Sequence, residues 1–384
     1  MGSEHAGEPI GVWLVGARGS VATTTIAGCA AIASGLAPPT GMVTALGAFD
    51  DVPLPALGDL VFGGCDLVEV PLAKRAEALT QAGVLPAGLQ ALVDDALDAA
   101  DADIVPGIST EDPPLAAIER VVESLGAFRS AHRLDRVVVV NCATTEAPAA
   151  HDDAHRDLGA LEGALASGRD VLPPSSLYAY AAFESGCGFV DFTPSTGARL
   201  PALAALAERR RVPHAGRDGK TGETLVKSAL AAMFVDRHLD VRSWAGVNLL
   251  GGGDGAALAD PDRAQSKRHS KGRALAAILG TEVEAPTEIV NVVDLGEWKT
   301  AWDRVSFAGF LGTRMRLEFT WEGADSTLAA PLVLDLARLV GAAHLAGRCG
   351  PIPELGYFFK DPDPGGEHRL DLALAALRRW AASL

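Results

Sequence analysis

IGVWLVGARGS, residues 10–20, is the stretch that decides the fold. Its first six residues, 10–15, are apolar and predict a buried strand of a parallel sheet, which Gly16 ends. Small residues at 23–34 then predict a helix, and Gly35 is placed to close it. A strand, a glycine turn and a helix in this order can bind a phosphate, because the helix start offers free N–H groups and a positive dipole end.

The turn departs from the usual dinucleotide-binding pattern. Ala17 and Arg18 stand where a second glycine often falls, so the turn alone is compatible with a dinucleotide site or with a plain tight turn. Its place directly after the first strand favours the dinucleotide site. No acidic residue lies about 20 residues further on, where the ribose hydroxyls usually find a carboxylate. Asp50, Asp51 and Asp66 are the later candidates.

The rest of the chain divides into two patterns. In the N-terminal part, apolar runs at 41–46, 103–108, 136–141 and 188–192 predict further strands, and 89–100 and 115–128 predict helices between them. This alternation predicts a parallel, doubly wound α/β sheet. From about residue 241, strands are expected at 242–250, 288–294, 305–310 and 314–321, the last two as a hairpin. Helices are expected at 327–346 and 370–382.

Composition narrows the classes of function. With 384 residues the chain is long enough for two domains. Its 49 acidic and 33 basic residues give a net charge of −16, which disfavours nucleic acid and anionic membranes as partners. A phosphorylated substrate would therefore need a local cluster of cations. Five cysteines without a C-x-x-C pair argue against a zinc site or disulfides and fit a reducing cytoplasm, and neither a signal peptide nor a membrane span is expected.

Five lysines lie beside glycine, aspartate, serine or aromatic residues: Lys220, Lys267, Lys271, Lys299 and Lys360. Lys267 and Lys271 are four residues apart and would share one helix face, where two like charges cost stability unless an anion lies between them. A phosphate is the natural anion, and a solvated basic face is the alternative for each lysine. Three aromatic residues precede Lys360 and predict its burial, which would lower its pKa and suit acid–base chemistry.

Other polar segments leave two interpretations open. Asn141–Glu146 follows a buried strand and could bind a ligand, or Thr144 or Thr145 could cap a helix there. The glycine-rich segment 248–255 could contact a ligand or be a plain loop. His151 and His155 are four apart, and a solvated helix face is expected there rather than a metal site.

Taken together, these motifs resemble the inositol-3-phosphate synthase family from about residue 11 to 362. The segments that carry the resemblance occur in the family's order: GVWLVGARGSVATTT, LVFGGCDL, RDGKTGET, NLLGGGDGAAL, SKRHSK, VDLGEWKTAWD, GADSTLAAPLVLDL and FFKDP. The resemblance implies an α/β fold with a Rossmann-type doubly wound parallel sheet and an inserted α+β domain for tetramerisation and catalysis. The expected division is 1–228 for the first part of the NAD-binding domain, 229–326 for the inserted domain and 327–384 for helices that return to the first. A cytoplasmic homotetramer is expected.

The resemblance also implies NAD, a hexose phosphate substrate and a set of site residues. In the family, glucose 6-phosphate is oxidised at C5, loses a C6 proton, closes by aldol addition of C6 to C1 and is reduced again. The implied catalytic residues are Asp218, Lys220, Lys267, Lys271, Lys299 and Lys360. The implied cofactor-binding residues are Gly16, Ala17, Arg18, Gly19, Ser20, Val21, Asp66, Asn141, Thr144, Gly216, Thr221, Gly253, Asp254, Asp294, Asp325 and Ser326. The implied substrate-binding residues are Leu250, Gly252, Ser266, Lys267, Lys271, Lys299 and Lys360. A monovalent or divalent cation is compatible with this chemistry, and its ligands stay unassigned.

Three departures from the family pattern keep other functions open. Gly252-Gly253 replaces an Asn or Thr pair, Asp191-Phe192-Thr193-Pro194 replaces Asn-Gly-[ST]-Pro, and Glu297 replaces an Asp. Because lost side-chain amides change which hydroxyls a site recognises, a paralogue that cyclises fructose 6-phosphate to a five-membered ring is one alternative. A simple NAD-dependent dehydrogenase and a non-catalytic NAD-binding scaffold are the others.

Overall fold

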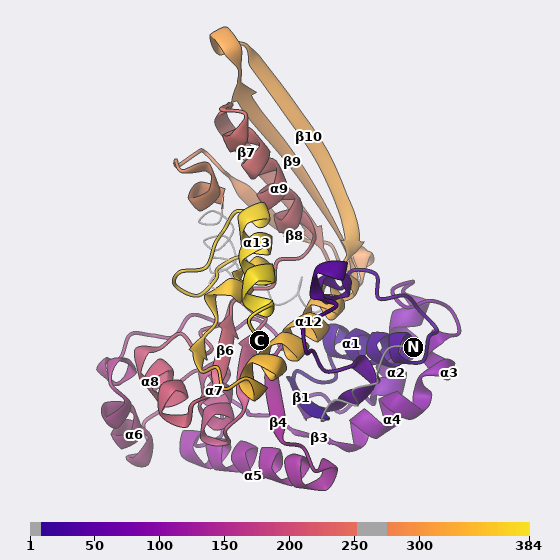
Figure 1. Ribbon diagram of the computed structural model, residues 1–384, viewed down its shortest axis with the longest axis vertical. Helices are drawn as coiled ribbons and strands as arrows, with labels where there is room; N and C mark the ends of the chain where they lie inside the picture. The colour runs from indigo at the N-terminus through magenta and orange to yellow at the C-terminus, as the bar shows by residue number, and fades with distance from the viewer. Residues whose placement is uncertain (1–8, 252–274) are drawn as a thin grey trace.

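The computed structural model describes residues 9–251 and 275–384 and contains two sheets (Figure 1). The larger sheet has seven strands in the order β11-β6-β5-β4-β1-β2-β3. Its strands are β1 Ile10–Val15, β2 Leu60–Asp66, β3 Ile104–Pro106, β4 Arg136–Asn141, β5 Gly188–Asp191, β6 Pro213–Gly216 and β11 Gly350–Pro351. All neighbouring strands in it are parallel. The order 3-2-1-4-5-6 is that of a dinucleotide-binding Rossmann sheet, which confirms the predicted doubly wound fold.

Alternate residues of β1 face two separate hydrophobic cores, as the period of two in a strand requires. Val12 and Leu14 belong to the core on one face, and Trp13 and Val15 to the core on the other. The first face is covered by α1 Ser20–Ala33, α2 Leu72–Gln81, α4 Asp94–Ala102, α12 Asp325–Leu345 and α13 Leu370–Ala381. The second is covered by α5 Pro114–His132, α6 Leu158–Ala166, α7 Pro174–Glu184 and α8 Pro201–Arg210. Both faces of the sheet are therefore buried, which explains its continuous apolar runs.

The smaller sheet has four strands in the order β10-β9-β7-β8. They are β7 Asp240–Leu250, β8 Thr287–Asn291, β9 Trp298–Ala308 and β10 Arg314–Ala324. The predicted hairpin is confirmed as antiparallel β9 and β10, which project beyond the rest of the molecule in Figure 1. Helix α9, Gly222–Asp236, packs on this sheet and shares a core with it that includes Phe234, Trp244 and Val305.

Helix α12 carries the chain from the smaller sheet back to the larger one. It is long and apolar enough to cross a membrane, but 72% of its most apolar window is buried inside the molecule, so it is a core helix. The helix begins two residues before the predicted start, which places Pro331 beyond its first turn. The proline ring instead packs against Gly41, whose backbone has a φ of +91°.

Several predicted elements differ from the structure. Residues 41–46 form no strand, and Val43–Ala45 is a single 3₁₀ turn, because the buried carboxylate of Asp335 accepts hydrogen bonds from its backbone amides. The predicted helix at 89–100 is two pieces, α3 Leu89–Leu92 and α4, which meet at Val93. The sequence patterns missed β2 and β6, whose glycine, proline and histidine residues interrupt the apolar runs.

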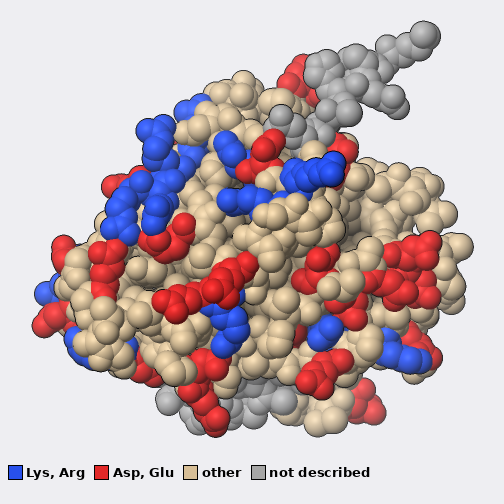
Figure 2. Space-filling view, turned by 90° about the horizontal axis from the view of Figure 1, so that it is seen from below, with Lys and Arg blue, Asp and Glu red and all other residues tan. Residues whose placement is uncertain are grey.

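The two histidines considered for a helix face lie elsewhere. His151 precedes a 3₁₀ turn, Asp153–Arg156, so the two histidines do not share an α-helix. His155 is buried and its Nε2 lies 2.6 Å from the carbonyl oxygen of Val171, which corrects the expectation of a solvated side chain. On the face shown in Figure 2, acidic groups are spread widely and basic groups gather most densely near one edge.

Candidate active site

A cleft of about 760 Å³ lies at the carboxyl ends of the central strands of the larger sheet. The cleft is lined by the turn after β1 and the segment after β4, and also by the end of β7 and the starts of β9 and α12. Strands β1 and β4 are the neighbours at which the strand order reverses. Ligands of open α/β sheets bind at this point.

The glycine turn approaches the segment after β4 closely. Gly16 has a φ of +80°, and a Cβ there would lie 2.7 Å from the Cα of Ala143. Helix α1 begins at Ser20 without a side-chain cap and without an acidic residue in its first turn. Gly19, Ser20 and Val21 line the cleft, so this helix start is open to an anion. These observations fit a bound pyrophosphate.

Asp66 is the last residue of β2 and lies beside the glycine turn. Its carboxylate accepts hydrogen bonds from the backbone N–H of Arg18 at 2.8 Å and of Val68 at 2.9 Å. The end of the second strand is where a Rossmann domain places its ribose-binding acid. The usual spacing fails here because residues 34–59 form an excursion of short 3₁₀ turns between α1 and β2.

Two chain segments from distant parts of the sequence pair at the floor of the site. Backbone hydrogen bonds run in both directions between Arg217 and Asp361, and the N–H of Lys360 donates to the carbonyl of Asp218 at 2.7 Å. The Lys360 ammonium also donates to the Asp218 carboxylate at 2.7 Å, and both side chains are buried. The burial predicted for Lys360 is therefore confirmed, and its charge is neutralised by a carboxylate within the site.

Lys220 lies in the same pair of segments, where its N–H donates to the carbonyl of Phe358 at 2.7 Å. Its side chain is 5% exposed. The pKa of Lys220 is lowered to about 8, chiefly by burial; the Glu367 carboxylate opposes this shift and the Lys360 cation adds to it. A lysine with such a pKa can exchange a proton near neutral pH.

Lys299 enters the cleft from the smaller sheet. It is the second residue of β9, and its ammonium donates to the carboxylate of Asp325 at 3.2 Å. Asp325 and Ser326 are the first residues of α12. Two lysine–aspartate pairs, Lys299–Asp325 and Lys360–Asp218, therefore line one cleft.

The carboxyl ends of β4 and β5 are joined by a buried polar network. The Asn141 amide donates to the Asp191 carboxylate at 3.1 Å, and the Thr193 hydroxyl donates to the same oxygen at 2.8 Å. Burial raises the pKa of Asp191 to about 7. Close by, Glu146 accepts from the N–H of Ser175 at the start of α7. Asp191 stands at one of the positions where the sequence departs from its family pattern, and here it orients Asn141 at the cleft.

The structure places most of the expected site residues together. Those that line the cleft are Gly16, Arg18, Gly19, Ser20, Val21, Asp66, Asn141, Thr144, Asp218, Thr221, Leu250, Lys299, Asp325, Ser326 and Lys360. Four others are not part of its lining: Ala17, Gly216, Lys220 and Asp294. Gly252, Gly253, Asp254, Ser266, Lys267 and Lys271 lie outside the described residues.

Further lining residues escaped the sequence patterns. They include Arg75, Thr193, Ser195 and Trp298. Glu146 is the last residue of the segment 141–146, for which a helix cap was the alternative interpretation. The chain forms no helix between β4 and residue 153, so the structure does not bear out that alternative. Glu146 lines the cleft, and its place after a strand is the signal from which the ligand-binding interpretation of residues 141–146 was drawn. Arg75 and Trp298 reach the cleft only through contacts between distant elements, which no local pattern encodes.

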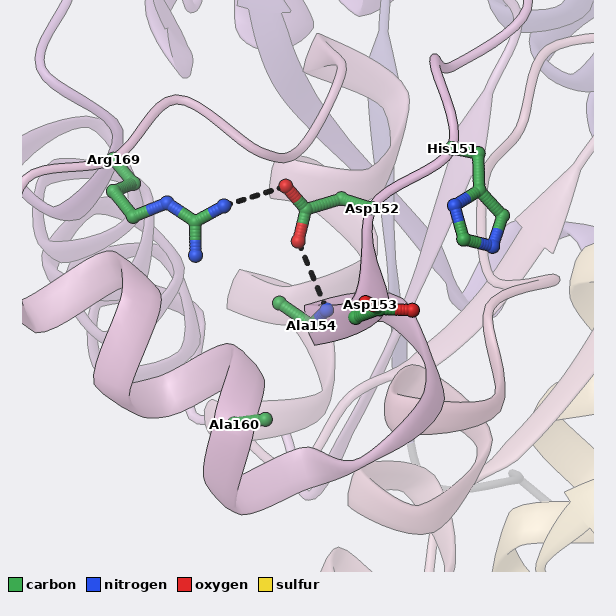
Figure 3. Close-up of a pocket in the computed structure, with 6 residues that line it drawn as sticks. All are labelled: His151, Asp152, Asp153, Ala154, Ala160 and Arg169. Carbon is green, nitrogen blue, oxygen red and sulfur yellow. Dashed lines mark hydrogen bonds and ion pairs between the residues drawn. The ribbon is translucent and has the colours of Figure 1, made fainter.

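A second hollow lies beside α6, lined by His151, Asp152, Asp153, Ala154, Ala160 and Arg169 (Figure 3). Arg169 and Asp152 form an ion pair at 2.6 Å, and Asp152 also accepts from the N–H of Ala154 at 2.9 Å. None of its residues lines the large cleft. Within residues 9–251 and 275–384, no group of three or more His, Cys, Asp or Glu side chains is arranged to hold a metal ion.

The strand order, glycine turn and terminal acid of β2 define an NAD-binding enzyme with a Rossmann-type domain. A family model described as myo-inositol-1-phosphate synthase matches residues 10–380. The chain belongs to this family of isomerase-type enzymes that use NAD.

Individual relatives agree with this assignment. The chain is 33% identical to inositol-3-phosphate synthase 1 of Bacteroides thetaiotaomicron, over 94% of this chain and 91% of the relative. It is 30% identical to inositol-3-phosphate synthase 1 of Bos taurus, over 83% of this chain but only 59% of that longer protein. The crystal structure of inositol-3-phosphate synthase from Caenorhabditis elegans has the same fold, with a TM-score of 0.86, 23% identity and coverage of 98% of this chain and 86% of the other.

Proposed function

We propose that the protein converts D-glucose 6-phosphate to 1D-myo-inositol 3-phosphate by an NAD-dependent cyclisation. The supporting observation is that Lys299 and the Lys360–Asp218 pair line the same cleft as the glycine turn. The order of steps on the sugar is oxidation of the C5 hydroxyl to a ketone, loss of a C6 proton, attack of C6 on the C1 aldehyde, and reduction of the C5 ketone. The substrate and product have the same composition, so no net oxidation occurs.

The residues present fit NAD, which when bound would supply the hydride acceptor for the oxidation and the hydride donor for the reduction. The start of α1 would hold the pyrophosphate and Asp66 the ribose hydroxyls. Asn141 and Thr144, at the carboxyl end of β4, would lie toward the reacting end of the cofactor. These assignments rest on the family resemblance and on the place of each residue at the edge of the sheet where its strands have their carboxyl ends.

The lysines would handle the charges that develop on the sugar. An enolate and an alkoxide form in turn, and each needs a nearby cation. Lys299 and Lys360 would stabilise the carbonyl oxygens at C1 and C5, with Asp325 and Asp218 holding the two ammonium groups in place. Lys220, whose pKa is lowered toward neutrality, would polarise reacting groups from beneath Lys360. By the family resemblance, Lys267 would carry the C5 hydroxyl proton and Lys271 would help to hold the phosphate.

We also propose the division of the chain and its assembly from the family resemblance. Residues 1–228 and 327–384 would form the NAD-binding domain, and 229–326 the domain for catalysis and association into a homotetramer. The exposed Phe310 and Leu311 at the tip of the β9–β10 hairpin, each 88% exposed, are consistent with contacts between subunits. The protein would act in the cytoplasm.

The experiment is an incubation of purified protein with NAD and ¹³C-labelled glucose 6-phosphate, followed by NMR of the products. We expect a six-membered cyclitol phosphate and no net change in absorbance at 340 nm. Net NADH formation would instead identify a simple dehydrogenase. A parallel reaction with fructose 6-phosphate tests the five-membered ring, and no cyclic product from either sugar would overturn the proposal.

A further inference from the structure

The ribose end of the cleft carries two guanidinium groups in addition to Asp66. Arg18 follows the glycine turn, and Arg75 lies on α2; both line the cleft. The Nε of Arg75 donates to the carbonyl oxygen of Arg18 at 3.2 Å. Guanidinium groups at this position of a Rossmann domain are the usual means of binding the 2′-phosphate of NADP. An enzyme that uses NAD and has two such guanidinium groups must prevent them from binding the 2′-phosphate of NADP.

Asp101, on α4, is placed to prevent this by pairing with Arg18. Its carboxylate accepts from the Nε of Arg18 at 3.0 Å, and the side chains of Arg18 and Asp101 are 16% and 23% exposed. Arg18 also donates from Nη1 to the carbonyl of Val68 at 3.1 Å. The guanidinium is thereby held by two acceptors and its charge is matched by a partly buried carboxylate.

The charges around the ribose position balance. Asp66 and Asp101 match Arg18 and Arg75, so a dianionic 2′-phosphate would find no uncompensated cation there. Loss of the Asp101 charge would leave one positive charge in excess. Of the two carboxylates, only Asp66 would then repel the 2′-phosphate.

We propose that Asp101 is a specificity-determining residue that makes the protein selective for NAD over NADP, and that it acts through Arg18. The proposal rests on the assignment of this cleft to NAD. It goes beyond the role of Asp66, because Asp101 lies on another element and does not line the cleft. Its effect is on the charge and position of the arginine rather than on the ribose itself.

The test is calorimetric titration of the full-length protein with NAD and with NADP, without sugar phosphate. The variant is Asp101→Asn, because an amide oxygen can still accept from the N–H of Leu72 at the start of α2, which Asp101 does at 3.4 Å. We expect NADP affinity to rise about tenfold and NAD affinity to change by less than about threefold. Adding Arg18→Ala to Asp101→Asn should abolish the gain.

Asp98→Asn is the matched control, because Asp98 is an exposed acid on the same helix and contributes the same net charge. It should leave the affinity for NADP at the wild-type value. An unchanged NADP affinity in Asp101→Asn, or an equal gain in Asp98→Asn, overturns the proposal while NAD binding by the wild type keeps the proposed function standing. A wild-type protein that binds neither nucleotide overturns both.

Discussion

At the scale of single residues, the Lys360–Asp218 pair connects the stability of the fold to the proposed catalysis. The two residues are 142 positions apart in the sequence and meet through buried side chains. Aromatic neighbours were enough to predict the burial of Lys360. The family resemblance implied Asp218 as a site residue, but local sequence patterns could not predict its pairing with Lys360, because the pairing depends on backbone hydrogen bonds between two distant segments.

Replacing Lys360 by Met should lower kcat by about 10²- to 10⁴-fold, because the cation beside the reacting oxygen is lost. It also leaves the Asp218 carboxylate buried without its lysine, at a cost of about 3–5 kcal/mol in the free energy of unfolding. The double variant Asp218→Asn/Lys360→Met should recover most of that stability but not the turnover. Product formation and urea unfolding measure the two effects. Turnover above a tenth of the wild-type value in Lys360→Met would contradict the role given to the lysine.

Gly16 provides a second prediction at this scale. Gly16→Ala places a side chain in a left-handed conformation, at a cost of about 1–2 kcal/mol, and 2.7 Å from the Cα of Ala143. The turn must shift, so affinity for NAD should fall at least about tenfold. Gly28→Ala, in α1 with no atom within 4 Å of the added Cβ, is the control and should preserve both affinity and stability. Calorimetric titration with NAD and thermal unfolding would show the difference, and equal affinities in the two variants would exclude this role for the turn.

At the scale of secondary structure, prediction succeeded where the residues of an element determine its conformation by themselves. Strands β1 and β4 have the predicted bounds, because their apolar residues are buried on both faces. Residues 41–46 were also predicted to form a strand, because this segment is an apolar run as well. They fold as a 3₁₀ turn because Asp335, nearly 300 positions later, accepts hydrogen bonds from Val43 N–H at 2.6 Å and from the Thr44 hydroxyl at 2.5 Å. A contact between residues so far apart in the sequence cannot be predicted from a short local stretch of residues.

The contact between α12 and this turn should depend on pH. Burial raises the pKa of Asp335 to about 6, above the value of about 3.9 in an unfolded chain. The folded state therefore holds more protons between pH 4 and 6, so the contribution of Asp335 to stability is fully present below about pH 4 and falls as pH rises to 6. Relative to Asp335→Asn, the wild type should lose about 2–3 kcal/mol across this range.

Urea unfolding of both proteins from pH 4.5 to 7.5 is the measurement. The comparison has to be made at each pH, because His344 on the same helix acts in the opposite direction. Burial lowers the pKa of His344 to about 4, so its contribution rises with pH between 4 and 6.5 in both proteins and cancels in the difference. A difference that stays constant with pH would show that the Asp335 carboxyl does not titrate in this range.

At the scale of the whole molecule, the cleft exists because two sheets are brought together. Trp298, the first residue of β9, lines the cleft and donates from its indole N–H to the carbonyl of Ala82, just after α2, at 2.9 Å. The fold class could be predicted from the sequence because strand and helix alternate. The arrangement of the second sheet over the first could not, since it depends on such single contacts across 216 positions.

Trp298→Phe should weaken NAD binding about two- to fivefold, because it removes one hydrogen bond of about 1 kcal/mol while keeping an aromatic ring at the cleft. Trp302→Phe is the matched control: this indole, 39% exposed on the same strand, does not line the cleft and has no hydrogen-bond partner among the described residues. Calorimetry with NAD distinguishes the two variants. Equal effects would mean that the contact with Ala82 does not position the cleft wall.

The pairing of residues 217–220 with 358–361 has a consequence for the protein during its synthesis. The glycine turn, the ribose acid and most strands of the larger sheet are translated long before Lys360 emerges. Under the proposed function, the nucleotide-binding residues are therefore synthesised before the last of the lysines that are proposed to handle protons. A chain that ended before residue 360 would lack the Lys360–Asp218 pair and, under the same proposal, would not turn over substrate.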